Sequence, residues 1–205
     1  MIAELRTYLL RPGGVPPTED LFGKHLHHRT PMSPLAGLWH TLTGQLNTVM
    51  HLWPYDDIQQ RTEIRDAMMR PPLWPPPLRP YLLEMDSVIL LPAPYSPPLA
   101  PARHGALYEF YVDSYLPGGP AACRDAWASA IDARVKLSPL VFCGASEFGR
   151  LNQWVSIWAY RDHAHRDEVQ ARVARDGTWP PEGGLEFLLK QESTLAAPAA
   201  CSPLN

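Results

Sequence analysis

The chain repeats one sequence skeleton at a fixed spacing. The segment Gly44-Gln45-Leu46-Asn47 returns 105 residues later as Gly149-Arg150-Leu151-Asn152, and a Trp and a Tyr follow each copy at matching positions. Pro12-Gly13-Gly14 and Ser33-Pro34-Leu35 recur at the same spacing. Agreement at so many positions rules out coincidence, so we expect a tandem of two related units. In a chain of 205 residues, each unit has the size of a small domain.

Proline marks the expected boundary between the units. The chain has 24 prolines, and many of them lie within residues 71–80 and 92–101. Such density excludes helix and central strand, and it favours stiff, extended segments. The second stretch lies where the repeat places a boundary. We therefore expect a first unit at residues 1–100, ending in a Pro-rich linker, and a second, diverged unit at residues 102–205.

Each unit is predicted to contain six elements in the order β-α-β-β-α-β. In the first unit, the predicted strands are residues 2–10, 37–43, 46–53 and 81–91, and the helices are 19–29 and 56–69. In the second unit, the strands are 107–112, 140–146, 151–160 and 185–194, and the helices are 121–135 and 163–175. This order is the ferredoxin-like arrangement of the α+β class. Two such sheets can bury their free faces in a dimeric α/β-barrel type arrangement, either within one chain or across a homodimer.

Composition argues against several classes of partner. The net charge is −3, and no cluster of Lys and Arg lies among aromatic residues, so nucleic acid is not an expected partner. No apolar run reaches the roughly 18 residues that a membrane span needs, and the N-terminus lacks the apolar core of a signal peptide. Cys123, Cys143 and Cys201 are odd in number and form no Cys-x-x-Cys pair, which is typical of reduced thiols in a cytoplasmic protein.

No cofactor or metal is expected from the motifs. His25 and His28 share a helix face but have no third ligand at helical spacing, so a solvated helix end is the preferred interpretation. The chain has no P-loop, Gly-x-Gly-x-x-Gly, Gly-x-Ser-x-Gly or His-Glu-x-x-His motif.

Longer motifs in the first unit resemble those of a known family. They are Glu4-Leu5-Arg6-Thr7-Tyr8, Gly44-x-Leu46-Asn47-x-Val49-x-His51-Leu52-Trp53-x-Tyr55, Trp74-Pro75 and Ser87-Val88-Ile89-Leu90-Leu91-Pro92. Together they resemble the NIPSNAP family, and the second unit resembles it more weakly. The resemblance implies a dimeric α+β barrel. It implies no single reaction, because barrel relatives include cofactor-free monooxygenases, haem enzymes and small-molecule cyclases.

Alternation along the strands predicts a polar face. Met50 and Leu52 are expected to face the helices, whereas His51 and Trp53 are expected to point into the barrel. The same assignment points Glu4, Arg6 and Tyr8 into the barrel. An unsatisfied buried polar group costs about 1–3 kcal/mol, so these groups need one another, water or a ligand.

The candidate site follows from that face. His51 is the leading candidate for proton transfer, and Arg6 or Tyr8 would hold an oxyanion. The candidates for substrate binding are Glu4, Asn47, Trp53, Tyr111, Trp154 and Trp158. Structural alternatives remain for most of them: a hydrogen-bonded core histidine, an internal Glu4–Arg6 ion pair, a turn asparagine and core tryptophans.

Two functions remain open at this point. The first is a cofactor-independent cyclase, isomerase or monooxygenase-like enzyme acting on a hydrophobic metabolite in bacterial specialised metabolism. It predicts a cavity inside the barrel. The alternative is a non-catalytic NIPSNAP-type binding or interaction protein, which predicts a filled barrel. A haem-binding variant is a third possibility.

Overall fold

The computed structural model describes residues 1–69 and 74–205. Residues 71–73 of the predicted Pro-rich stretch lie outside them. The first unit comprises β1 (Ile2–Leu10), α1 (Val15–Arg29), β2 (Gly37–Thr41), β3 (Thr48–Tyr55), α2 (Ile58–Met69) and β4 (Leu82–Pro92). The second comprises β5 (Leu107–Tyr115), α3 (Gly119–Arg134), β6 (Leu140–Phe148), β7 (Gln153–Tyr160), α4 (His163–Asp176) and β8 (Leu188–Pro198). The predicted order of elements is confirmed in both units.

The largest boundary differences are four residues each, at the start of α1 and at the end of β8, which runs to Pro198 rather than to residue 194. The helix begins at Val15 rather than at residue 19, and it carries a proline in its first turn. A proline is tolerated there because the first backbone N–H groups of a helix have no acceptor within the helix. The α3 helix has the same arrangement, with Pro120 in its first turn.

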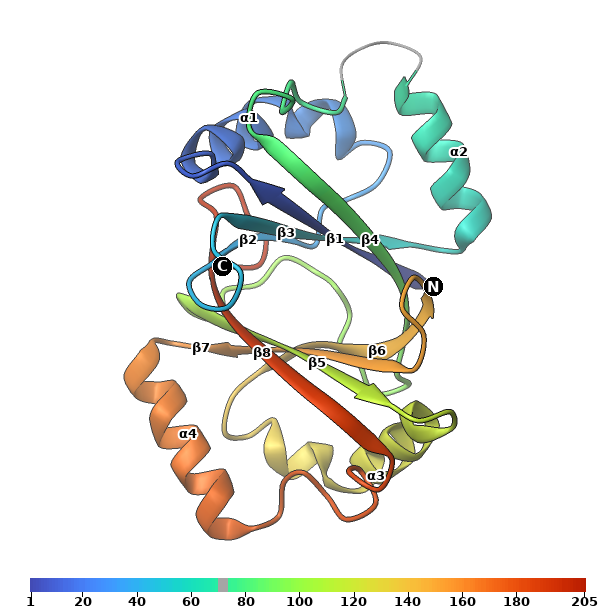
Figure 1. Ribbon diagram of the computed structural model, residues 1–205, viewed down its shortest axis with the longest axis vertical. Helices are drawn as coiled ribbons and strands as arrows, with labels where there is room; N and C mark the ends of the chain where they lie inside the picture. The colour runs from blue at the N-terminus through green and yellow to red at the C-terminus, as the bar shows by residue number, and fades with distance from the viewer. Residues whose placement is uncertain (70–73) are drawn as a thin grey trace.

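The eight strands form one closed barrel in the order β1-β3-β2-β8-β5-β7-β6-β4. Within each unit the strand order is that of a ferredoxin-like sheet. Two antiparallel seams join the units, β2 with β8 and β4 with β6, for example at Trp39↔Pro198 and Leu91↔Ala145. The barrel therefore closes within one chain. Its sheets lie back to back, with α1 and α2 outside one and α3 and α4 outside the other (Figure 1).

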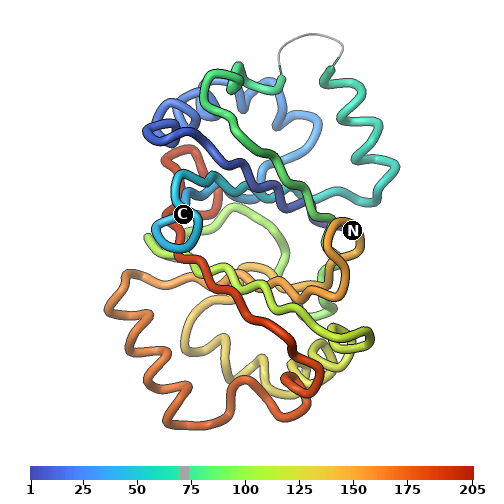
Figure 2. The backbone as a smooth tube through the Cα atoms, viewed as in Figure 1, coloured from blue at the N-terminus to red at the C-terminus, as the bar shows by residue number. Residues whose placement is uncertain are grey.

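The C-terminal residues also tie the units together. After β8 the chain crosses to the first unit, as the red end of the tube shows in Figure 2. There the Ala199 N–H donates to the Leu38 carbonyl at 2.9 Å, and the Leu38 N–H donates to Ser202 Oγ at 3.0 Å. Leu204 then pairs with Ala102 in the segment that connects β4 to β5.

Apolar side chains from all eight strands fill the barrel. This cluster is formed by buried residues that include Leu5, Trp39, Met50, Leu52, Leu90, Tyr108, Phe142, Ile157 and Ala196. The predicted assignment of the strand faces is therefore wrong. Met50 and Leu52 point into the barrel, whereas Trp53 and Tyr8 belong to the layer beneath the helices of the first unit. Both faces of each sheet are buried, so apolar residues occur on both and alternation alone does not tell which is inside.

Among the described residues, no helix combines the length and apolar character that crossing a membrane requires.

Candidate functional site

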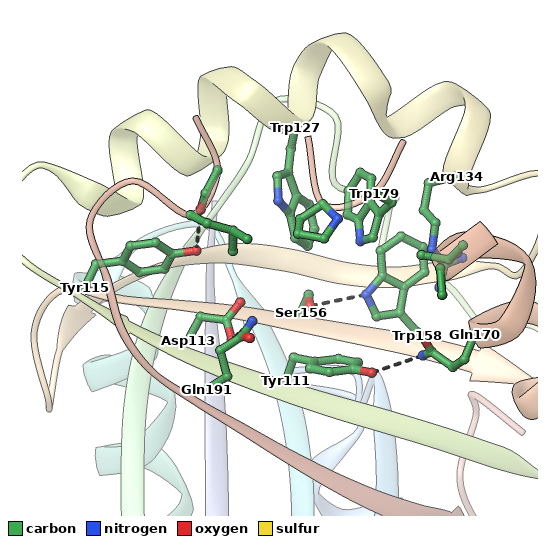
Figure 3. Close-up of a pocket in the computed structure, with 15 residues that line it drawn as sticks. Tyr111, Asp113, Tyr115, Trp127, Arg134, Ser156, Trp158, Gln170, Trp179 and Gln191 are labelled. Atoms are coloured by element: carbon green, nitrogen blue, oxygen red, sulfur yellow. Dashed lines mark hydrogen bonds between the residues drawn. The ribbon is translucent and has the colours of Figure 1, made fainter. Parts of the chain in front are cut away.

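Each unit has a cavity between its sheet and its two helices, in equivalent positions. The second-unit cavity measures about 280 Å³, and its lining includes Tyr111, Asp113, Trp127, Arg134, Ser156, Trp158, Gln170, Trp179 and Gln191 (Figure 3). The first-unit cavity measures about 120 Å³ and is lined by Arg6, Tyr8, Arg29, Arg65, Met68, Met69, Trp74, Pro75 and Met85. By the 105-residue repeat, Arg6 of the first unit is equivalent to Tyr111 of the second. Tyr8 is likewise equivalent to Asp113, and Arg65 to Gln170. The two cavities thus share a position but differ in chemistry.

A buried carboxylate network is common to both units. In the first, Glu4 is fully buried and accepts hydrogen bonds from Arg61 Nη2 at 2.5 Å and Ser87 Oγ at 2.6 Å. In the second, Glu109 accepts from Arg166 Nη2 at 2.7 Å and Ser193 Oγ at 2.6 Å. Burial opposes ionisation of Glu4, but the hydrogen bonds from Arg61 and Ser87 outweigh it and lower the pKa to about 2. The repetition of this network indicates a structural role.

His51 lies in the core beneath α1. The residue is only 2% exposed, and the centroid of its ring lies 4.7 Å from that of Tyr8 and 5.1 Å from that of Phe22. The Trp53 indole N–H donates to its Nδ1 at 2.6 Å. Burial lowers the pKa of His51 well below its usual value, and the positive charges of Arg6 and Arg29 act in the same direction. The imidazole is therefore neutral at pH 7.

The second unit holds Ser156 at the position of His51. Its Oγ accepts from the Trp158 indole N–H at 3.2 Å (Figure 3). A hydroxyl thus replaces the imidazole as the tryptophan's acceptor. Because the serine side chain is smaller, Ser156 lines open space, whereas His51 does not line the first-unit cavity.

Asp113 is the carboxylate of the second-unit cavity. It is 5% exposed, and its Oδ1 accepts a hydrogen bond from Gln191 Nε2 at 3.1 Å. Burial raises the pKa of Asp113 to about 6, and the hydrogen bond from Gln191 opposes the rise only in part. No described Lys or Arg forms an ion pair with it. The group is therefore able to gain or lose a proton near neutral pH.

Polar groups line the wall near Trp158. Gln170 Nε2 donates to the Tyr111 hydroxyl at 3.1 Å, as Figure 3 shows. Burial raises the pKa of Tyr111, and the negative charge of Glu109 adds to the rise, so its hydroxyl keeps its proton. Arg134 lies over the Trp158 ring at 4.0 Å and donates through Nη1 to Ser138 Oγ at 2.8 Å. The tryptophans supply apolar walls, and these groups supply a few convergent hydrogen-bonding positions.

Comparison with known proteins identifies the fold and the repeat. The NIPSNAP family model matches the chain twice, at residues 3–97 and 108–203. The chain belongs to the NIPSNAP family. Human NipSnap homolog 3B is 31% identical in an alignment that covers 98% of this chain and 85% of that protein. Human NipSnap homolog 3A is also 31% identical, with the same coverage.

The chain is also similar to solved structures, over one unit or over its whole fold. A NIPSNAP domain protein from Burkholderia xenovorans is 34% identical and covers 48% of this chain and 100% of its own, with a TM-score of 0.46. A protein from Lactobacillus acidophilus is 9% identical over 97% of this chain and 94% of its own, with a TM-score of 0.68. An anthrone oxidase-like protein is 11% identical over 96% and 90%, with a TM-score of 0.62. At these identities, the last two share the fold alone.

The predicted site residues are divided between the NIPSNAP units. Arg6 and Tyr8 line the first-unit cavity, and Tyr111 and Trp158 line the second. Glu4 belongs to the carboxylate network, and Trp53 and Trp154 are core residues of separate units. Asn47 sits in the turn before β3 with φ of 57°, as Asn152 does before β7 with φ of 56°. The structure does not bring the nine residues together.

Sequence reasoning missed Gln170 and Gln191 and did not select Asp113 for the site. Alignment of the two units by their repeat shows Tyr111 and Asp113 on β5 where Arg6 and Tyr8 lie on β1. The same comparison of α4 and β8 would have revealed the two glutamines. Among the described residues, no group of three or more His, Cys, Asp or Glu side chains is arranged to hold a metal ion.

Proposed function

We propose that the second-unit cavity binds a small hydrophobic metabolite and that Asp113 transfers a proton on it without a cofactor. The observation that carries the proposal is a buried carboxylate without a cationic partner, facing a cavity with tryptophan walls. Ionisable groups with strongly shifted pKa values in a cleft are typical of acid–base sites. Asp113 replaces Tyr8 of the first unit, so the feature belongs to one cavity only.

Proton transfer at this site has a simple form. Ionised Asp113 takes a proton from a carbon next to a carbonyl group of the ligand. The electron pair of that C–H bond forms a C=C bond, and the π pair of the carbonyl group moves to its oxygen to give an enolate. The Tyr111 hydroxyl and the Ser156 hydroxyl are donors that line the same cavity. Return of the proton to another atom completes an isomerisation. In a cyclisation, the enolate carbon attacks a second carbonyl group of the ligand, the π electron pair of that group moves to its oxygen, and the resulting alkoxide takes the proton back from Asp113.

A non-catalytic binding role is the second candidate. The packed barrel interior is the feature that this alternative predicts. In that case the second-unit cavity would hold a ligand without changing it. Asp113 would then only accept a hydrogen bond from the ligand and so favour ligands that carry a donor group.

Extraction of bound metabolites separates these possibilities. The full chain would be incubated with an extract of the native host, purified again and analysed by mass spectrometry. Asp113→Asn is expected to retain the unconverted compound, because asparagine keeps the shape of the side chain, and wild type is expected to retain that compound together with its conversion product. Ala174→Met is expected to lose the compound, because methionine at this rim position copies the first unit and reduces the opening. Leu151→Ala, at an exposed turn, is the matched control.

The time course then decides on chemistry. Conversion of the retained compound by wild type, with conversion by Asp113→Asn at least 100-fold slower, supports proton transfer. Retention without conversion by either protein favours the non-catalytic role. If Ala174→Met retains as much compound as wild type does, the second-unit cavity is not the binding site.

A further inference from the structure

The first-unit cavity concentrates positive charge. Three arginines line it: Arg6 from β1, Arg29 from α1 and Arg65 from α2. The nearest carboxylate is Glu4, whose oxygens already accept from Arg61, Ser87 and Tyr55. Arg6 Nε lies 3.9 Å from Glu4 Oε1, and neither Arg29 nor Arg65 forms an ion pair with a described residue. The cavity therefore carries more positive than negative charge.

Some of the guanidinium N–H donors in this cavity have no acceptor in the described part of the chain, and Arg29 is the clearest case. The residue is 4% exposed, and Nη2 donates to the Tyr55 hydroxyl at 2.8 Å. Nη1 is buried and has no partner among the described residues, and the same is true of Arg6 Nε. A buried donor of a charged group without an acceptor is costly, and such exceptions need an explanation.

The second unit supplies an internal comparison for Arg29. Its counterpart Arg134 donates through Nη1 to Ser138 at 2.8 Å, and its buried Nε is the atom that has no partner among the described residues. The equivalent Ser33 instead donates to the Pro54 carbonyl, at 3.4 Å. Arg29 Nη1 therefore has no acceptor among the described residues. The counterparts of Arg6 and Arg65 are the uncharged Tyr111 and Gln170. The excess of positive charge is thus specific to the first unit.

The remaining walls of the cavity are apolar. Met68, Met85 and Trp74 line it together with the arginines. Met85 is 48% exposed, so the cavity reaches the surface on this side. Planar guanidinium groups match the geometry of carboxylates and phosphates, whereas thioether and indole groups bind apolar chains. A ligand that satisfies both parts of the cavity has an anionic head and a short apolar tail.

We propose that the first-unit cavity binds a small organic carboxylate. Its carboxylate group accepts hydrogen bonds from the three arginines, including Arg29 Nη1, and its tail lies against Met68 and Met85. This inference is independent of the chemistry proposed for Asp113, because it concerns the other cavity and other residues.

Isothermal titration calorimetry on the full chain tests the proposal. The probes are hexanoate, hexan-1-ol, which has the same tail without the charge, and inorganic phosphate, which has the charge without the tail. Hexanoate is expected to bind at one site per chain, and hexan-1-ol and phosphate are expected to bind at least tenfold more weakly. Arg65→Gln, which copies Gln170 of the second unit, should weaken hexanoate binding at least tenfold, the loss of about one charge-assisted hydrogen bond.

Control variants test whether hexanoate binds in the first-unit cavity rather than elsewhere on the chain. Arg175→Gln removes an exposed arginine from α4 and should leave the affinity for hexanoate unchanged. Equal affinities of wild type and Arg65→Gln for hexanoate would overturn the proposal, as would equal binding of hexan-1-ol. If phosphate binds with the same dependence on Arg65 and hexanoate does not, the carboxylate assignment is wrong. Binding that only Ala174→Met abolishes would place hexanoate in the second-unit cavity instead.

Discussion

At the residue scale, Asp113 places an ionisable group where the first unit has Tyr8. Both side chains lie beneath helices and are almost fully buried. A tyrosine hydroxyl remains neutral there, whereas a carboxylate must lose much of its hydration when it ionises. Such a position is unfavourable for stability when the carboxylate is ionised.

Asp113 should therefore make stability depend on pH. Its pKa is about 6 in the fold and about 3.9 in an unfolded chain, so the folded state binds more protons between these values. The contribution of Asp113 to the free energy of unfolding therefore falls as the pH rises from about 3.9 to about 6. Asp113→Asn is expected to be more stable than wild type at pH 7.5, and the gain should shrink by about 2 kcal/mol at pH 4.5. Urea denaturation at the two pH values measures it, and a gain that does not change with pH would contradict the raised pKa.

His51 is expected to be a structural residue. His51→Ala removes the ring from contact with Tyr8 and Phe22 and leaves the Trp53 indole N–H without its acceptor. The free energy of unfolding should fall by about 2–4 kcal/mol. Ser156→Ala removes only a hydroxyl at the equivalent place and should cost about 1 kcal/mol. Urea denaturation of both variants checks the difference, and an unchanged stability of His51→Ala would contradict a structural role.

At the element scale, the seams between the units depend on close contact of backbones. Gly144 in β6 faces β4, and a Cβ at this position would lie 2.3 Å from the Leu91 carbonyl oxygen. Gly144→Ala must therefore separate the strands and should lower the free energy of unfolding by about 3 kcal/mol or more. Gly23→Ala, within α1, is the control. A Cβ at this position would lie 3.7 Å from the Cys201 side chain, which is an ordinary contact distance. This variant should be neutral or stabilising by up to about 1 kcal/mol. If thermal unfolding shows both variants to be equally stable, the β4–β6 seam is not as tight as described.

The elements also show how far the sequence could predict the structure. Their order and most boundaries followed from turn residues such as Gly44 and Asn47 and from the repeat. The strand faces could not be predicted in this way, because Met50 and His51 are adjacent and both are buried. The second-unit cavity brings Asp113 together with Gln170 and Gln191, which are 57 and 78 residues away along the chain. Only the packing of α4 and β8 on the sheet makes them neighbours.

At the scale of the whole molecule, residues 1–69 and 74–205 form a closed barrel in which neither sheet has a free edge or a free face. An isolated first unit, residues 1–100, would expose the barrel face of its sheet, including Leu5, Trp39, Met50 and Leu90. We expect this fragment to pair with a second copy, because burial of apolar surface contributes about 25 cal/mol per Å². Native mass spectrometry should then show a fragment dimer, while the full chain at the same concentration stays monomeric. A fragment that remains monomeric and soluble would contradict the boundary near residue 100.

Closure of the barrel within one chain has a consequence for how this protein can change over evolution. In a symmetric pair of identical subunits, every substitution enters both cavities at once, and a change that suits one must be tolerated by the other. Here Arg6 and Tyr111, or Tyr8 and Asp113, are encoded by separate codons. One cavity can keep its arginines while the other acquires a carboxylate, so a single gene can carry two ligand specificities that selection adjusts independently.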